Sequence, residues 1–310
     1  MKVSVCIPCY RAAKNIPIVV EGLKKIISAR GDEYQIILAN DGSPDNTFEV
    51  ISELCHEDKR IIGIDLIKNY GQSSAKLAAL KYATGDVVLF MDDDGQHPVE
   101  HIYDLIDKLQ DGYDVVYGYF SNKTHSTFKR ITSSIHKWLA EVMGNKAKGV
   151  HTSPFHVWNK TVAETMKRYH SPFISIGGYI THVTSKFGEV EVPHKERLSG
   201  TSGYTFKKLV KIWKDIFFSF SMMPLQIATT VGIVVSAGGF LGIIYLIILK
   251  VVHSTVLAGY VSTNIFILFF GGLILFSVGI VGEYIGRIYM TVSNMPQYSV
   301  RAIINDEKSA

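Results

Sequence analysis

Three consecutive aspartates, Asp92, Asp93 and Asp94, directly follow the apolar run 87–91. Unpaired carboxylates beside a buried strand cost free energy, so their repulsion has to be offset. In an extended segment alternate residues point the same way, so Asp92 and Asp94 can converge on one ion while Asp93 turns aside. Hard oxygen ligands in this number suit Mg²⁺ or Mn²⁺, with substrate phosphates completing the shell. The alternative is a solvated acidic loop, which the position after a buried strand disfavours.

The elements expected to position these aspartates alternate along the first part of the chain. Alternation of strand and helix indicates an α/β fold with a mostly parallel sheet covered on both faces. Asp45 or Asn46 is expected to cap the second helix, and Gly31 to end the first. The strands are predicted at 2–10, 34–41, 61–67 and 86–92, and the helices at 15–30, 45–57 and 71–83.

Each predicted strand ends in a distinctive polar segment. Ligands of such sheets bind beyond the carboxyl ends of the strands, so the four segments are expected to form one site. Asp41 could instead serve only a turn, because Asp-Gly is ordinary turn chemistry. The four segments are "PCYR" at 8–11, "NDGS" at 40–43, "KNYGQ" at 68–72 and "DDDGQH" at 92–97.

The last third of the chain has a different composition. No charged residue occurs between Asp215 and Lys250, and a second uncharged run extends from there to Gly282. Each run is long enough to cross ~30 Å of hydrocarbon as a helix, although two buried core helices are the alternative. The expected organisation is a catalytic domain at 1–203, an interface helix at 204–222, transmembrane helices at 223–250 and 263–286, and a tail at 287–310.

Basic residues flank the apolar runs unequally. Lys207, Lys208, Lys211 and Lys214 precede the first run, whereas the connector offers only Lys250. The positive-inside rule therefore predicts a multi-pass protein of the plasma membrane, with its large domain and its tail cytoplasmic. Helical spacing of the four lysines also predicts contact with anionic membrane lipids. Small-xxx-small spacing at 238/242 and 282/286 permits close helix packing within one chain or in a homo-oligomer.

Composition excludes some function classes. The net charge of +4 is slight and no nucleic-acid-binding module is recognisable, so nucleic acid is not an expected partner. The three cysteines show no metal-ligand or disulfide-framework spacing, which is typical of reduced thiols. A membrane anchor or sensor without catalytic activity would have no reason to keep the aspartates together with Arg197, the first residue of the later segment "RLSGTSGY".

Four motifs together resemble the family 2 glycosyltransferases of the GT-A fold: "PCYR", "NDGSPDNT", "DDDGQHP" and the late "RLSGTSGY". More narrowly, the chain resembles polyprenyl-phosphate glycosyltransferases, namely dolichol-phosphate mannose synthase and the bactoprenol glucosyltransferases of the GtrB type. The latter share a pair of membrane spans ending in "GEYIGRIY", which occurs here at 282–289. The resemblance covers essentially the whole chain. A processive polysaccharide synthase is disfavoured, because no Gln-x-x-Arg-Trp motif surrounds any tryptophan.

The resemblance implies inverting transfer of one sugar from a nucleotide-sugar, UDP-glucose by resemblance, to a polyprenyl phosphate such as undecaprenyl phosphate. The acceptor phosphate is already ionised, so no general base is assigned. The diphosphate leaving group needs a cation and a guanidinium. The implied residues are Pro8, Tyr10, Arg11, Asp41 and Asp93 for the donor, Asp92, Asp94 and Gln96 for the metal, Arg197 and Ser202 over the diphosphate, and Arg130 and Ser133 for the acceptor phosphate. Asp94, Gln96 and Arg197 are the expected catalytic residues.

Two histidines and one helical segment carry further expectations. His97 is expected to support the aspartate loop rather than to catalyse. His151 replaces an acidic residue frequent in the related proteins, so the identity of the sugar stays open. Segment 126–144 has apolar residues at helical spacing and is either a surface helix packed on the sheet or an interface helix facing lipid.

Overall fold

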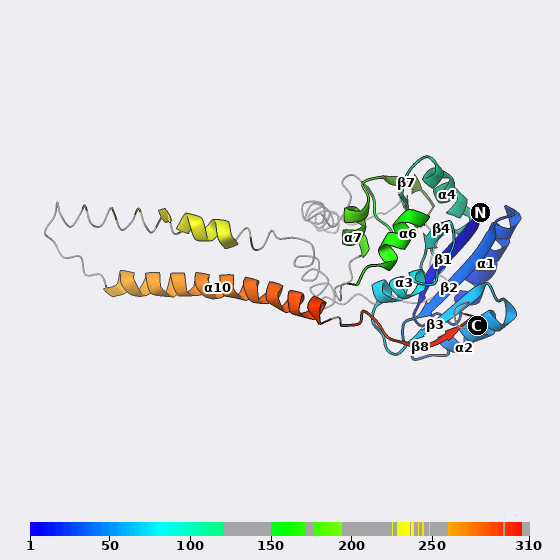
Figure 1. The fold of residues 1–310 in the computed structure, drawn as a ribbon, viewed down its shortest axis with the longest axis horizontal. Coiled ribbons are helices and arrows are strands. Elements are labelled where there is room, and N and C mark those ends of the chain that lie inside the picture. The colour runs from blue at the N-terminus through cyan, green and yellow to red at the C-terminus, as the bar shows by residue number, and fades with distance from the viewer. Residues whose placement is uncertain are drawn as a thin grey trace. The chain divides into compact units, whose positions relative to one another are not determined.

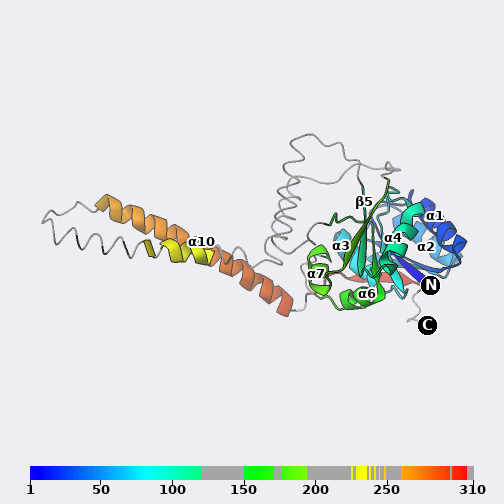
Figure 2. The same cartoon turned by 90° about the horizontal axis from the view of Figure 1, so that it is seen from above.

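The structure is a computed structural model that describes residues 1–120, 150–170, 176–193, 225, 228–235, 237, 238, 241, 244, 248, 260–293 and 295–305 (Figures 1 and 2). The chain divides into two compact units. The first comprises Met1–Lys211 with Met295–Ala310, and the second comprises Ile212–Asn294.

An eight-stranded sheet forms the centre of the first unit, in the order β7-β5-β6-β4-β1-β2-β3-β8. The inner strands β4, β1, β2 and β3 run parallel, whereas β6 and β8 run antiparallel to their neighbours. The mostly parallel α/β sheet predicted from the sequence is confirmed. The strands are β1 (Lys2–Cys9), β2 (Glu33–Asn40), β3 (Ile61–Leu66), β4 (Val87–Phe90), β5 (Val115–Tyr119), β6 (His156–Asn159), β7 (Phe187–Glu191) and β8 (Val300–Ile304).

Helices cover both faces of the sheet. In both views α1, α2 and α4 lie on one side and α3, α6 and α7 on the other (Figures 1 and 2). The strands alternate between the two cores: Ile36 and Leu38 face the first group, and Ile37 faces the second. Burial on both faces explains the almost continuous apolar sequence of the inner strands. The helices are α1 (Ile16–Ala29), α2 (Thr47–Glu57), α3 (Gln72–Leu80), η1 (Val99–His101), α4 (Ile102–Gln110), α6 (Lys160–Lys167) and α7 (Ile176–Val183).

The predicted elements of the first 92 residues agree with the structure to within a few residues at each end. Gly31 follows α1 with a left-handed φ of +76°, as a helix-ending glycine does. Capping of α2 differs in detail. Asn46 occupies the N-cap position but makes no side-chain capping bond, whereas Asp45 accepts a hydrogen bond from the Thr47 hydroxyl at 2.6 Å.

The tail, to which the sequence analysis gave no secondary structure, contributes strand β8 to the edge of the sheet. β8 pairs antiparallel with β3, so a segment that follows the apolar region in sequence belongs to the same sheet as the first strands. Asn305, just after β8, donates to the Ile61 carbonyl oxygen at 2.9 Å. The first unit is therefore built from both ends of the chain.

Helix α10 (Tyr260–Val292) belongs to the second unit. Among the described residues it is the one helix long and apolar enough to cross a bilayer, over Phe269–Val292. The ion pair Glu283–Arg287, with 3.1 Å between nitrogen and oxygen, offsets the two charges within that stretch. This agrees with the second predicted span. Half of the first predicted span, at 223–250, lies outside the described residues, so that span stays a prediction, as does the interface helix at 204–222.

Candidate active site

The carboxyl ends of the first four strands are joined to one another by hydrogen bonds. The Tyr10 amide, just after β1, donates to the Asp93 carboxylate after β4 at 3.0 Å. The next amide, of Arg11, donates to the Ser43 hydroxyl after β2 at 3.1 Å. Arg11 adopts a left-handed φ of +55°, which is uncommon for a residue with a side chain and marks a constrained turn. The predicted convergence of the strand ends at one edge is therefore present in the structure.

Asp41 connects the end of β2 to the start of α3. Its carboxylate is buried and accepts from the amides of Tyr70 at 2.7 Å and Gly71 at 2.9 Å. Gly42 lies against the same loop with a φ of +61°, and a Cβ there would come within 2.4 Å of the Lys68 carbonyl carbon. Asp41 and Gly42 thus fix the path of the loop that precedes α3. Asp41 has a structural role in the loop whether or not it also binds a nucleotide.

Two residues of α3 that the sequence analysis did not single out contact the acidic motif. The side-chain amide of Gln72 donates from Nε2 to Asp92 Oδ1 at 2.6 Å, and Lys76 Nζ lies 3.3 Å from the same oxygen. Lys76 is buried, with a side chain only 8% exposed, so its charge is directed at Asp92 rather than at solvent. Positions i and i+4 share one face of a helix, and that spacing in "GQSSAK" is the signal that would have found the pair. A lysine therefore supplies part of the positive charge that the aspartates require.

Asp93 has different partners from Asp92: it accepts the Tyr10 amide after β1, whereas Asp92 contacts α3. The pKa of Asp93 is raised to about 6, first by burial and then by the neighbouring charges of Asp92 and Asp94, while the hydrogen bond from Tyr10 opposes the shift. Asp94 Oδ1 accepts from the Gln96 amide at 3.1 Å, which closes the loop behind the motif. The predicted turning aside of Asp93 agrees with these contacts.

Two buried histidines lie next to the motif. His97 Nδ1 accepts the Asp92 amide at 2.9 Å, and its ring stacks on Phe155 with 5.2 Å between centroids. These contacts give His97 the supporting role expected from the sequence. His156 stacks on Phe90 at 5.0 Å, and its burial, together with the charge of Lys76, lowers its pKa to about 3. His156 is therefore neutral at physiological pH and cannot serve as a proton store.

The donor set of the motif fits a small divalent cation. Among the described residues no three His, Cys, Asp or Glu side chains lie close enough together to hold a metal by themselves. Mg²⁺ and Mn²⁺ in nucleotide sites commonly take one or two carboxylates and complete their shell with phosphate oxygens and water. Asp92 and Asp94, both partly exposed beside the Gln96 loop, supply two such carboxylates. The third predicted ligand, the Gln96 side chain, stays a prediction.

The remaining predicted residues fall into two groups. Pro8 is buried in β1 opposite Ala39, whereas Tyr10 is 44% exposed with the Arg11 guanidinium 5.5 Å from its ring centroid. Tyr10 and Arg11 are thus available at the edge where a nucleotide is expected. Outside the described residues lie Arg130, Ser133, Arg197 and Ser202.

Beyond the motif, His151 stacks on Tyr119 with 5.3 Å between centroids, and its Nδ1 lies 3.1 Å from Glu189. Glu191, two residues along β7, accepts from the Tyr119 hydroxyl at 3.2 Å. Tyr119, at the carboxyl end of β5, and His151 thus each contact a carboxylate of β7.

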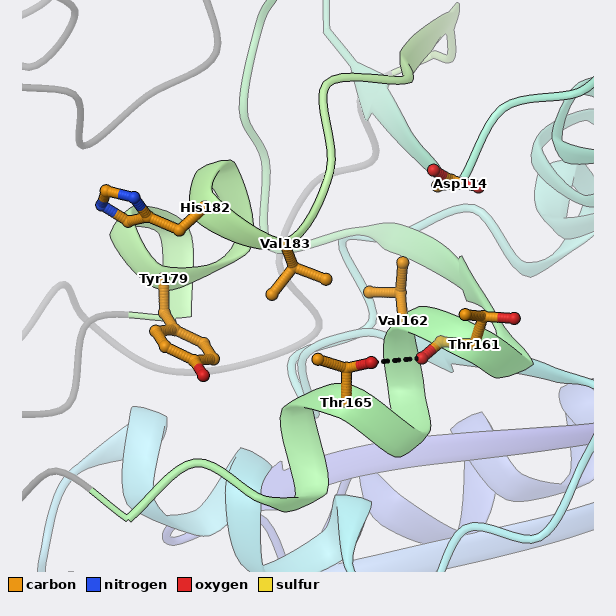
Figure 3. A pocket seen from close by; sticks show the side chains of 7 residues that line it. All are labelled: Asp114, Thr161, Val162, Thr165, Tyr179, His182 and Val183. Atoms are coloured by element: carbon orange, nitrogen blue, oxygen red, sulfur yellow. Dashed lines mark hydrogen bonds between the residues drawn. The ribbon is translucent and has the colours of Figure 1, made fainter.

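A separate cavity of about 350 Å³ lies between α6 and α7. Its lining includes Asp114 and Tyr179, which approach it from different elements (Figure 3). Asp114 directly precedes β5, so the cavity is at the amino end of that strand, on the opposite edge of the sheet from the aspartates. Both Asp114 oxygens are engaged, one by Asn159 at 2.8 Å and one by Thr184 at 2.5 Å. The cavity is therefore not part of the candidate site.

Comparison with known proteins identifies the family. The profile of glycosyl transferase family 2 matches residues 4–166, which is more than half of the chain and includes every described strand end of the site. The chain belongs to glycosyltransferase family 2. It is therefore a glycosyltransferase, and the site at the carboxyl ends of β1–β4 is the candidate active site of that enzyme.

Related family 2 members match over nearly the full length. The chain is 33% identical over 313 residues to the undecaprenyl-phosphate 4-deoxy-4-formamido-L-arabinose transferase of Proteus mirabilis, covering 99% of this chain and 95% of that protein. It is 32% identical over 299 residues to the uncharacterized glycosyltransferase YkcC of Bacillus subtilis, covering 96% and 93%. Among solved structures, mannosyl-3-phosphoglycerate synthase from Rubrobacter xylanophilus aligns at a TM-score of 0.50 and 16% identity over 70% of this chain and 71% of that chain, which is a likeness of fold.

Proposed function

We propose that this family 2 glycosyltransferase moves a single sugar from a nucleotide-sugar to a polyprenyl phosphate at the cytoplasmic face of the plasma membrane. The observation that carries the proposal is the full-length likeness to the Proteus mirabilis undecaprenyl-phosphate transferase, which extends over 99% of the chain and therefore includes the apolar region as well as the catalytic domain. Undecaprenyl phosphate is accordingly the proposed acceptor, and the product is a polyprenyl-phosphate-linked sugar.

The proposed donor site is the polar edge of the sheet. Pro8, Tyr10, Arg11 and Asp41 would hold the base and ribose, with Asp93 fixing the Tyr10 turn. Asp92 and Asp94, with Gln96, would hold Mg²⁺ or Mn²⁺, which when bound supplies positive charge to the diphosphate leaving group. Arg197, with Ser202 in the same segment, would stabilise the same developing charge through paired hydrogen bonds.

The proposed reaction is an in-line displacement at the anomeric carbon. An oxygen of the acceptor phosphate forms the new bond, the bond to the nucleoside diphosphate breaks, and the configuration of the sugar inverts. Arg130 and Ser133 would bind the acceptor phosphate. Because that phosphate is already ionised, no side chain has to remove a proton, and the neutral His156 beside the motif is consistent with this.

Strand β8 supports a multi-pass topology. β8 lies in the same sheet as β1–β7, so the chain before and after the apolar region is on the same side of any membrane crossed in between. This pairing supports an even number of crossings between residues 193 and 300. With α10 as one span, the uncharged stretch within 223–250, which has the required length and composition, is the proposed second span.

UDP-glucose is the donor proposed from the family resemblance. A second candidate is a UDP-linked 4-deoxy-4-formamido-L-arabinose, favoured by two relatives, both undecaprenyl-phosphate 4-deoxy-4-formamido-L-arabinose transferases, that are 31% and 33% identical to this chain. The two donors differ at carbons 4 and 5 of the sugar, so they test the sugar pocket rather than the nucleotide site.

Purified full-length protein in detergent tests the proposal directly. It is incubated with undecaprenyl phosphate, MnCl₂ and a panel of UDP- and GDP-sugars, and the lipid products are identified by mass spectrometry. The expected product is undecaprenyl phosphate carrying one sugar, absent from the Asp94→Asn variant. Products carrying several sugars would point to a processive synthase instead. No lipid-linked product from any donor of the panel, including the formamido-arabinose donor, would refute the proposed function.

A further inference from the structure

Arg301 lies at an irregularity of strand β8, where the tail meets β3. Ala302 pairs with Asp65 and Val300 pairs with Leu66, so Arg301 is the extra residue of a β-bulge between them. Bulges re-aim the side chain of the inserted residue and are frequent beside active sites. Here the guanidinium donates from one nitrogen to Asp65 at 3.1 Å and from another to the Ile67 carbonyl oxygen at 2.8 Å.

Asp65 is a buried carboxylate whose two oxygens have different partners. One oxygen receives Arg301, and the other accepts the Asn40 side-chain amide at 2.7 Å. The Asp65 side chain is 4% exposed, so removing its cation would leave a charge in the protein interior without a counterion. The position and orientation of Asp65 therefore depend on Arg301.

Asn40 links Asp65 to the edge of the sheet where the nucleotide-sugar donor is proposed to bind. It ends β2 immediately before Asp41, it is 2% exposed, and its side-chain oxygen Oδ1 accepts the backbone amide of Ser43 at 3.3 Å. Ser43 in turn accepts the Arg11 amide at 3.1 Å, in the turn with left-handed φ that follows β1. A continuous run of polar contacts thus leads from the tail to the two loops proposed to hold the nucleotide.

We propose that Arg301 is a positioning residue for the donor site, acting through Asp65, Asn40 and Ser43. The inference rests on the proposed function, because it assigns the loops at 10–11 and 41–43 to the nucleotide-sugar. Strand β8, which follows α10 in the sequence, then helps to hold the donor loops in place. A chain that ends before β8 would have the donor residues but not the arrangement that makes them bind.

A control is available at the amino end of β3, the strand that contains Asp65. Arg60 directly precedes β3 and pairs with Asp58 at 2.9 Å, and its side chain is 60% exposed against 8% for Asp58. The corresponding values for Arg301 and Asp65 are 61% and 4%. Arg60→Ala therefore removes a guanidinium of similar exposure from a similarly buried aspartate at the amino end of the strand, away from the donor edge, although Lys24 still lies 3.2 Å from Asp58.

The experiment measures nucleotide binding and kinetics of full-length protein. UDP and GDP are titrated calorimetrically in the presence of MnCl₂, and donor KM, acceptor KM and kcat are measured well below the melting temperature. Arg301→Ala is expected to raise the Kd for the bound nucleotide and the donor KM about tenfold, with acceptor KM and kcat changed less than about twofold. Arg301→Lys should recover part of the affinity for the nucleotide, because lysine keeps the positive charge but lacks the paired N–H donors of the guanidinium.

Two comparisons separate positioning from a merely structural role. Arg60→Ala should lower the melting temperature, by less than Arg301→Ala because Lys24 still pairs with Asp58 at 3.2 Å, and should leave the nucleotide Kd unchanged. Asp65→Asn and the double variant Arg301→Ala/Asp65→Asn should have the same donor Kd as Arg301→Ala, because both substitutions interrupt one path. Additive losses, or equal losses in Arg60→Ala, would overturn the inference while sparing the proposed function. Failure of the unmodified protein to bind either nucleotide would refute the proposed function as well.

Discussion

Replacing Asp93 by asparagine is expected to stabilise the metal-free protein at alkaline pH. Desolvation by burial is the first cause of its raised pKa, which is about 6 in the folded protein against an ordinary value of 3.8. Above pH 6 the folded protein must therefore carry a charge that its surroundings disfavour. Asparagine can still accept the hydrogen bond from the Tyr10 amide, so the substitution removes the charge and keeps the contact.

The size of the effect follows from the shift in pKa. A difference of about two pKa units corresponds to ~3 kcal/mol of unfolding free energy above pH 6. The sign is fixed by the direction of the shift: the folded state holds the proton more tightly, so the wild type loses stability as pH rises from about 4 through 6. At pH 4 the advantage of Asp93→Asn should fall below ~1 kcal/mol. For a domain of this size ~3 kcal/mol corresponds to ~6–12 °C in Tm.

Differential scanning fluorimetry of full-length protein in detergent and EDTA measures the difference at pH 8 and at pH 4. Asp111→Asn is the control, because Asp111 is 61% exposed and pairs with Lys108 at the surface, so the loss of its charge should leave Tm nearly unchanged. Added MnCl₂ should narrow the gap between wild type and Asp93→Asn, since a bound cation stabilises the ionised Asp93. Equal Tm values for wild type and variant at pH 8, or a gain as large at pH 4 as at pH 8, would refute the electrostatic reasoning.

Four further outcomes are expected. Asp94→Asn should abolish transfer without lowering Tm, and EDTA should have the same effect on the wild type; activity retained in either case would contradict a metal role. Gly42→Ala should cost several kcal/mol, because its Cβ would collide with backbone at 2.4 Å, and a variant that unfolds at the wild-type urea midpoint would be at odds with this geometry. Arg130→Ala should raise the acceptor KM about tenfold, equivalent to ~1.4 kcal/mol, with the nucleotide Kd unchanged; the reverse pattern would assign Arg130 to the donor. Ser254→Cys should react with an impermeant thiol reagent from outside intact cells and Glu100→Cys should not, and reversed labelling would rule out a cytoplasmic catalytic domain.

Local patterns were sufficient for the first 92 residues. Each strand there is a short apolar run closed by a polar segment, and each helix between them has its own amphipathic period, so both the elements and the functional edge were predictable. The same logic located the aspartates at one edge together with Asp41. Lys76 was missed for a different reason. A lysine inside a helix is ordinary, and its burial against Asp92 depends on where α3 packs on the sheet.

The later strands were not predictable in this way. β6 inserts antiparallel between β4 and β5, and its sequence "HVWN" is too short to show a period. β8 has its partner more than 230 residues earlier in the chain, on the other side of the apolar region. No local feature of "VRAII" indicates that pairing, so the link from Arg301 to the donor edge is visible only in the folded chain.

The acidic motif brings three carboxylates together, and a buried lysine contacts one of them. Lys76 lies 3.3 Å from Asp92, while Asp94 and, above pH 6, Asp93 add two further negative charges. Two like unit charges ~5 Å apart at an effective dielectric constant of ~20 repel by ~3 kcal/mol, and a nucleoside diphosphate brings more than one such charge to the same edge. A donor that entered the site alone would meet that repulsion in full. A divalent cation removes it for both sides at once, since each carboxylate and each phosphate oxygen then faces a positive charge. Metal and donor are therefore expected to bind with positive coupling, each raising the affinity for the other by the same factor.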